Sequence, residues 1–202
     1  MNATSMFHAA LEELLSRVRP LLVVVSNGRH GAGAGVLAGA GLVLTNLHVA
    51  GRARSLQVSL EDGSSYDARV IARDPQVDLA LLQIPVTGPA AAIFSDSAPR
   101  PGELVYAFGH PWGQRAVLTG GVLSAVTSLR GRHGQVPVLR ADLQLAPGNS
   151  GGPLLNASGE VIGLNAMIFG GDQSVAIPAS LIRSFLAGAR QNMNNKSPEA
   201  VL

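Results

Sequence analysis

Residues 148–153 read Gly-Asn-Ser-Gly-Gly-Pro and place a single serine, Ser150, among glycines. Without bulky neighbours, the serine hydroxyl and the amides beside it can approach a substrate closely. A serine hydroxyl is a weak nucleophile, so acyl transfer also requires a histidine base, an orienting carboxylate and backbone N–H groups directed at the developing oxyanion. The stretch therefore predicts an acyl-transfer site, provided that the chain supplies the other two side chains.

Two segments that precede the serine supply a histidine and an aspartate. Residues 45–49 read Thr-Asn-Leu-His-Val and contain His48, and Asp78 directly precedes an apolar run, Leu-Ala-Leu-Leu. Their order along the chain, histidine, aspartate and serine, is that of the chymotrypsin-type triad. Asp78 could instead only cap a turn, in which case Asp74 is the rival carboxylate. The remaining histidines are interpreted as surface or packed residues: His8, His30, His110 and His133.

Together these motifs resemble the trypsin-like serine proteases, and most closely the HtrA (Deg) family, over about residues 8–190. The resemblance implies a serine endopeptidase in which His48 takes the proton of Ser150 while Asp78 holds the imidazole. It also implies that the amides of Gly148 and Ser150 bind the oxyanion. The alternative function is a peptide-binding, chaperone-like module that uses the protease fold with little turnover.

The composition excludes several other classes of protein. The 15 basic and 13 acidic residues give a net charge of +2, which does not favour nucleic acid or membrane as a partner. Cysteine is absent, so neither a disulfide framework nor thiol catalysis is possible. The apolar run at residues 21–25 is too short for a signal peptide or a membrane span. We therefore expect a cytoplasmic protein that needs no metal or cofactor.

The first half of the chain reads as a short helix followed by closely spaced strands. Residues 7–18 form an amphipathic pattern that Pro20 should end. Residues 31–35, Gly-Ala-Gly-Ala-Gly, could suggest a phosphate loop, but no helical pattern follows them, so a hairpin of packed strands is favoured. The second strand of this hairpin should carry His48 at its end. Three more strands are expected at residues 56–60, 66–72 and 79–84.

A break at residues 95–102, rich in serine and proline, is interpreted as a linker to a second β unit. Strands are expected beyond it at residues 104–108, 116–126, 136–144, 161–167 and 174–177. A helix at 179–190 and a polar, disordered tail at 191–202 should close the chain. The predicted fold is all-β, with two small antiparallel barrels at about 20–97 and 101–190 within one protease domain, and one helix at each end.

The resemblance also directs attention to the wall of the primary substrate pocket. Trypsin carries an aspartate six residues before its nucleophile, and the corresponding position here is 150 − 6 = 144, which is Gln144. The pocket is then assigned to Gln144, Leu145, Ala166, Met167 and Ile168. An apolar pocket without a counter-charge should accept small to medium aliphatic residues and reject Arg and Lys. Such residues are buried in folded proteins, which predicts unfolded or misfolded chains as substrates and a role in protein quality control.

Two expectations concern what surrounds the protease domain. Most HtrA proteins carry PDZ modules, and the residues after 190 show no pattern of one, so we expect a protease domain that lacks a PDZ domain. The resemblance and the N-terminal segment, with Phe7 and several leucines, suggest a homotrimer. The equal alternative is that this helix packs on its own barrel.

Overall fold

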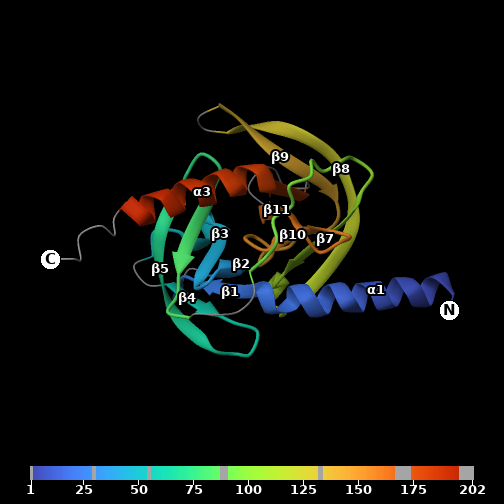
Figure 1. Ribbon diagram of the computed structural model, residues 1–202, viewed down its shortest axis with the longest axis horizontal. Helices are drawn as coiled ribbons and strands as arrows, with labels where there is room; N and C mark the ends of the chain where they lie inside the picture. The colour runs from blue at the N-terminus through green and yellow to red at the C-terminus, as the bar shows by residue number, and fades with distance from the viewer. Residues whose placement is uncertain are drawn as a thin grey trace.

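The computed structural model describes residues 2–28, 31–53, 56–86, 91–131, 134–166 and 174–195. Within these residues the strands form two closed antiparallel barrels, each of six strands (Figure 1). The first barrel contains β1 (Leu22–Ser26), β2 (Ala32–Gly39), β3 (Leu42–Asn46), β4 (Leu56–Ser59), β5 (Ser65–Asp74) and β6 (Leu79–Gln83). The second contains β7 (Leu104–Gly109), β8 (Val117–Gly131), β9 (Gly134–Asp142), β10 (Pro153–Asn156), β11 (Val161–Ala166) and β12 (Ser174–Pro178).

Both barrels close by pairing strands that are distant in sequence. In the first barrel β1 pairs with β4, and in the second β10 pairs with β7. The order around the barrels is β1-β2-β3-β6-β5-β4 and β10-β11-β12-β9-β8-β7. Closure leaves no unpaired edge, which is how small antiparallel folds satisfy their backbone groups. The predicted all-β double barrel is confirmed.

Strand β6 explains how the two barrels are joined. Its residues 79–82 are all buried, although a strand places alternate side chains on opposite faces. Ala80 and Leu82 face the core of the first barrel. Leu79 and Leu81 face a second core, which residues of both barrels share with the helices. The continuous apolar run in the sequence therefore marks a strand with a core on each side.

Two helices pack against this shared core. The N-terminal helix α1 (Ala3–Val18) begins earlier than expected, because the Asn2 side chain accepts a hydrogen bond from Ser5 N at 2.8 Å and caps it. A 3₁₀ turn (Arg19–Leu21) follows and contains the predicted breaker, Pro20. Only Leu14 and Val18 of α1 are buried. Leu11 and Leu15 are partly buried against the shared core, and the exposed residues 3–10 project from the barrels (Figure 1).

The C-terminal helix α3 (Ala179–Asn195) corrects the predicted tail. Residues 191–195, expected to be disordered, continue the helix, and no proline or glycine in this stretch interrupts its hydrogen bonds. Ile182 and Leu186 pack into the core shared by the barrels. Residues 196–202 lie outside the described residues.

Candidate active site

His48 lies just after β3 rather than at its end. The strand finishes at Asn46, and a short helical turn, α2 (Leu47–Ala50), carries the histidine. This corrects the expectation that a strand would deliver His48. At the start of the turn Leu47 N donates to Asp78 O at 3.0 Å, and Val49 and Ala50 of the turn pack into the core of the first barrel.

Asp78 holds His48 at two places. Its Oδ1 accepts a hydrogen bond from His48 N at 2.9 Å, and its Oδ2 lies 2.6 Å from His48 Nδ1. An ionised carboxylate can only accept hydrogen bonds, so Nδ1 carries the proton and the lone pair of the neutral ring is on Nε2. Asp78 adopts φ 57, a left-handed conformation that aspartate tolerates better than most residues. The ring is thereby held as a base with Nε2 available.

The rival carboxylate, Asp74, is occupied elsewhere. Its Oδ1 accepts hydrogen bonds from Gln76 N at 2.9 Å and Val77 N at 3.4 Å, within its own turn. Asp74 therefore stabilises the turn that leads into Asp78, whereas Asp78 contacts the histidine.

The segments that carry Ser150 and His48 both pack on β2. The backbone O of Ser150 accepts a hydrogen bond from Ala34 N at 2.8 Å. A Cβ atom on Gly33 would lie 2.8 Å from the side chain of Val49, which follows His48, and 3.0 Å from Ser150 O. The glycine thus allows the histidine turn of the first barrel and the serine loop of the second to pack against one strand. Ser150 itself is 7% exposed.

The loop before the serine presents two backbone N–H groups. Within the described part of the chain, the amides of Gly148 and Ser150 donate to no protein acceptor. Pro147 O accepts a hydrogen bond from Trp112 N at 2.8 Å, and a trans peptide points its N–H opposite to its C=O. The Gly148 N–H is therefore directed away from residues 110–116. Gly148 has φ 107, which favours glycine.

The structure places only part of the predicted substrate pocket. Gln144 is exposed, and Leu145 is half-buried against the core of the second barrel. Ala166 is fully buried at the end of β11, next to Asn165, whose carbonyl accepts a hydrogen bond from Gly151 N at 2.9 Å. Met167 and Ile168 lie outside the described residues.

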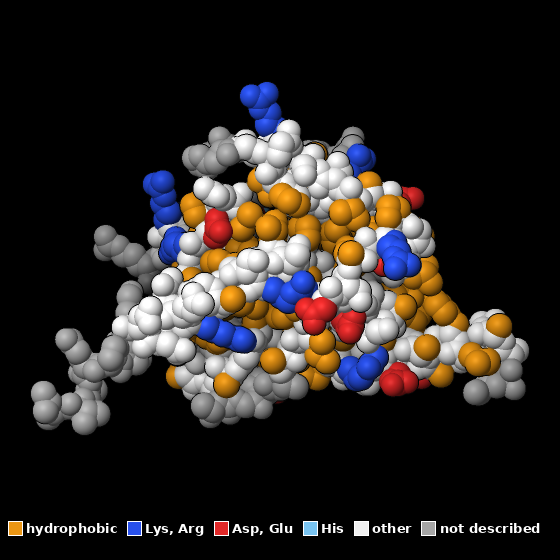
Figure 2. All heavy atoms as spheres, turned by 45° about the horizontal axis from the view of Figure 1, so that its top comes forward, with side chains coloured by type: hydrophobic (Ala, Val, Ile, Leu, Met, Phe, Trp, Pro, Cys, Tyr) orange, Lys and Arg blue, Asp and Glu red, His pale blue; other side chains and the backbone are white. Residues whose placement is uncertain are grey.

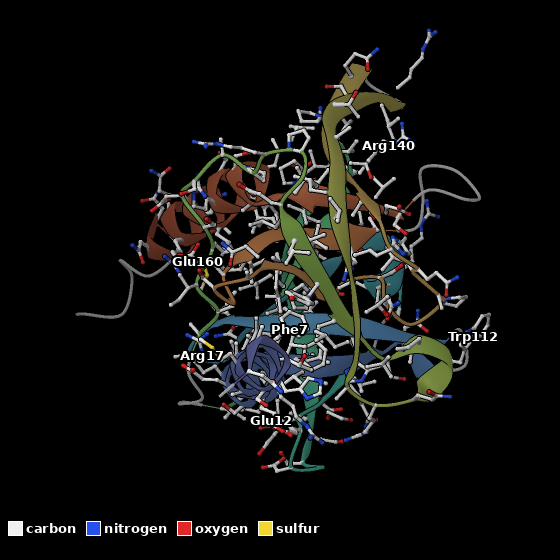
Figure 3. The ribbon with its side chains drawn as sticks, turned by 90° about the vertical axis from the view of Figure 1, so that its right-hand side faces the viewer. Phe7, Glu12, Arg17, Trp112, Arg140 and Glu160 are labelled. Atoms are coloured by element: carbon white, nitrogen blue, oxygen red, sulfur yellow. The ribbon has the colours of Figure 1, made fainter. Side chains whose placement is uncertain are left out.

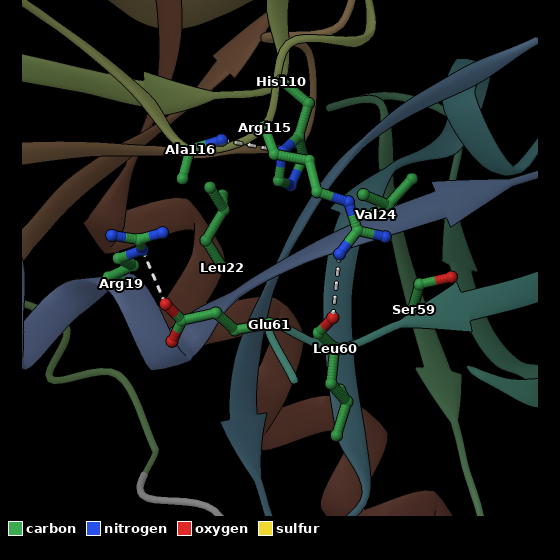
Figure 4. A pocket seen from close by; sticks show the side chains of 9 residues that line it. All are labelled: Arg19, Leu22, Val24, Ser59, Leu60, Glu61, His110, Arg115 and Ala116. Atoms are coloured by element: carbon green, nitrogen blue, oxygen red, sulfur yellow. Dashed lines mark hydrogen bonds and ion pairs between the residues drawn. The ribbon is translucent and has the colours of Figure 1, made fainter. Parts of the chain in front are cut away.

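His110 was predicted only as a surface or packed residue, and it is buried, at 8% exposed. It lines a small cavity of about 50 Å³ between the barrels (Figure 4). Burial lowers the pKa of His110 from 6.5 to about 4, with a smaller contribution from the charge of Arg115. The nearby backbone of Val23 raises the pKa of His110 and so partly offsets burial, although it does not meet the geometry of a hydrogen bond to Nε2. No sequence pattern distinguishes this histidine from the others.

The wider surface carries no concentration of one charge on the face shown in Figure 2, where acidic and basic side chains are scattered singly among apolar areas. Trp112 is 74% exposed and projects at the edge of the molecule (Figure 3). Among the described residues, no three His, Cys, Asp or Glu side chains gather in a way that could hold a metal ion.

A double β-barrel with an aspartate-bound histidine and a serine loop between the barrels defines the class of chymotrypsin-like serine peptidases. The family model described as "Trypsin-like peptidase domain" matches residues 33–164, and the chain belongs to this family. Its relatives are HtrA and DegP proteins, which confirms the HtrA-type resemblance.

Three comparisons define this relationship. The chain is 40% identical over 155 residues to "Serine protease HTRA1" of Xenopus tropicalis, covering 73% of this chain and 33% of that protein. It is 39% identical over 150 residues to a "Probable periplasmic serine endoprotease DegP-like" of Marinomonas sp., covering 71% and 32%. The crystal structure of a serine endoprotease from Yersinia pestis superposes with a TM-score of 0.78 at 30% identity, covering 88% and 65%.

The chain spans about a third of the length of the curated relatives it matches. Among the described residues, no helix is both long and apolar enough to cross a membrane. The cytoplasmic location expected from the sequence gains no support from the DegP-like relatives, whose names describe them as periplasmic.

Proposed function

We propose that this chain is a serine endopeptidase that cleaves unfolded or flexible polypeptides after small to medium aliphatic residues. The observation that carries the proposal is the two-point hold of Asp78 on His48, because it fixes the tautomer that a general base requires. The packing of Ser150 and Val49 on Gly33 supports the same assignment.

The proposed reaction uses each group in turn. His48 Nε2 takes the proton of Ser150 as its Oγ attacks the scissile carbonyl, and Asp78 stabilises the imidazolium that forms. The free amides of Gly148 and Ser150 donate to the oxyanion of the tetrahedral intermediate. His48 then protonates the leaving amine. In the second half of the reaction His48 takes a proton from a water molecule, which attacks the acyl group and releases it from Ser150.

The proposed specificity depends on the absence of a counter-charge. Gln144 stands where trypsin has its aspartate, and it is exposed, while the half-buried Leu145 supplies apolar surface. A cationic side chain entering such a pocket would lose its hydration without gaining an ion pair. An aliphatic side chain has no charge to desolvate, and burial of its apolar surface favours binding. Because aliphatic residues are buried in native proteins, this preference supports unfolded or misfolded substrates and a quality-control role.

We further propose a homotrimer built through α1. Met6 and Phe7 are 57% and 50% exposed on a helix that extends beyond the barrels, so the alternative of full packing on its own barrel leaves them uncovered. Exposed large apolar side chains on a projecting element are suited to an interface between subunits. The resemblance to HtrA proteases supports this choice of partner.

A fluorophosphonate probe tests the proposed activity directly. We expect the wild-type chain to be labelled and the Ser150→Ala chain to remain unlabelled, with cleavage of an unfolded protein substrate lost in parallel. The chaperone-like alternative predicts the opposite pattern: binding of the unfolded protein by wild type, without labelling or turnover.

A further inference from the structure

The loop that follows β7 is folded around the side chain of His110. His110 Nδ1 accepts a hydrogen bond from Ala116 N at 3.2 Å, which ties the two ends of the loop at residues 110–116 (Figure 4). Within it, Gly113 N donates to His110 O at 3.1 Å and Gln114 N donates to Pro111 O at 2.9 Å. The imidazole Nδ1 therefore accepts the hydrogen bond that closes this loop, as a backbone carbonyl does in a shorter turn.

The protonation state of this imidazole follows from its surroundings. Because Nδ1 accepts a hydrogen bond, it must be unprotonated, so the ring is neutral with its proton on Nε2. His110 Nε2 is buried and has no hydrogen-bond partner among the described residues. The charged groups around it are Arg115, on the same loop, and the ion pair of Arg19 with Glu61, which lines the same cavity. The pKa of about 4 agrees with a ring that stays neutral near pH 7.

The same loop contacts the oxyanion segment on both sides of one glycine. His110 N donates to Gly148 O at 3.1 Å, and Trp112 N donates to Pro147 O at 2.8 Å. These two carbonyls flank the amide that we assign to the oxyanion hole. The Gly148 N–H shares a planar peptide unit with Pro147 O, so it cannot turn toward the loop without breaking the bond from Trp112, and the bond from His110 fixes the next peptide unit.

We infer that His110 is a positioning residue of the oxyanion hole: its Nδ1 closes the 110–116 loop, and this loop aims the Gly148 N–H at the reacting carbonyl. The inference rests on the proposed function, because it concerns the same reaction. An apolar side chain of similar size at this position would leave the part-buried Ala116 N without an acceptor. The loop would then rearrange to satisfy that amide, and the hydrogen bonds from Trp112 and from residue 110 would be lost with it.

Two substitutions separate this role from simple packing. His110→Asn places an amide oxygen where Nδ1 lies and keeps the acceptor, whereas His110→Leu keeps apolar volume and removes it. We expect His110→Leu to lower kcat by about 10- to 100-fold with KM within about threefold of wild type, approaching the loss of one oxyanion donor. His110→Asn should retain kcat within about threefold.

A transition-state analogue provides a second measurement. A peptide boronate forms a tetrahedral adduct with Ser150, so its affinity should fall with kcat in His110→Leu and recover in His110→Asn. The affinity of the matching product peptide should be the same in all three. Val58→Ala, a core substitution in the first barrel, is the matched control: it should lower stability without changing kcat or boronate affinity.

Each outcome bears on one claim. Equal kcat in His110→Leu and wild type would overturn the positioning role, as would equal losses in the Leu and Asn variants. If Val58→Ala lost kcat to the same extent as His110→Leu, the effect would be one of stability, and the inference would be wrong. Failure of the wild-type chain to react with fluorophosphonate or substrate would instead refute the proposed function.

Discussion

The lowered pKa of His110 predicts that this histidine makes the stability of the fold depend on pH. In the unfolded chain the imidazole binds a proton below about pH 6.5, whereas in the folded chain it does so only below about pH 4. Between these values the unfolded state binds more protons, so stability must fall as the pH falls. The contribution of His110 is complete above about pH 6.5 and is lost progressively down to about pH 4.

The size of this effect follows from the pKa difference. The step from 6.5 to about 4, at about 1.4 kcal/mol for each pKa unit, corresponds to about 3.5 kcal/mol of unfolding free energy once the pH lies well below both values. Urea unfolding followed by circular dichroism, at about pH 7.5, 6.5, 5.5 and 4.5, measures it in a Ser150→Ala background that prevents self-digestion. The comparison chain is His110→Asn, which keeps the Nδ1-type acceptor but does not titrate.

The difference in unfolding free energy between the two chains isolates His110, because every other titrating group is common to both. We expect wild type to lose stability relative to His110→Asn by about 2.5 kcal/mol between about pH 7.5 and 4.5. His8→Asn, at an exposed position on α1, is the control for the exchange of a histidine for an asparagine. A difference that stays constant with pH for His110→Asn would refute the reasoning, since it would mean that the buried ring of His110 titrates as it does in the unfolded chain.

Three further predictions concern the proposed activity and assembly. Replacing Ser150 or His48 with alanine should each lower kcat by about 10⁶, and both together by little more, because the groups act as one unit; Asp78→Asn should cost about 10⁴, and additive losses in single-turnover assays would contradict the assignment. Digestion of a peptide library should show cleavage after Val, Ala, Leu or Ile, and Leu145→Ala should change that profile; a preference for Arg or Lys would exclude the apolar pocket. Light scattering at tens of micromolar should give a trimer that Phe7→Asp converts to monomer, and a wild-type monomer would end that proposal.

Much of the fold could be predicted because the relevant signals are local. The strand patterns at 104–108 and 174–177 depend only on neighbouring residues, and they agree with β7 and β12. Strand β10 was missed because it is only four residues long and begins at Pro153, which the sequence presents as a turn residue. The end of α3 was misplaced because polarity suggested disorder, whereas polar residues 191–195 continue the helix.

The candidate site divides in the same way. The side chains of the proposed triad could be found because each lies in a short motif with a chemical reason for its composition. The support of the oxyanion segment could not, because it consists of backbone hydrogen bonds between residues more than thirty positions apart, such as Trp112 N to Pro147 O. Every residue except proline carries the same backbone N–H, so the residue types do not reveal which amides form these hydrogen bonds. The role of His110 depends on which atom its ring faces, and only the fold determines that.

The core shared between the barrels has a consequence for dissection of the protein. Strand β6 has one face in the first barrel and the other in the shared core, where Leu79 and Leu81 meet Leu155 and Ile177 of the second barrel. A fragment that ended in the linker at residues 95–102 would expose that second face to water. The two halves should therefore be insoluble or partly folded when expressed alone, and should regain an ordered structure only when mixed. Although each barrel is closed by its own hydrogen bonds, the smallest autonomous folding unit is the pair.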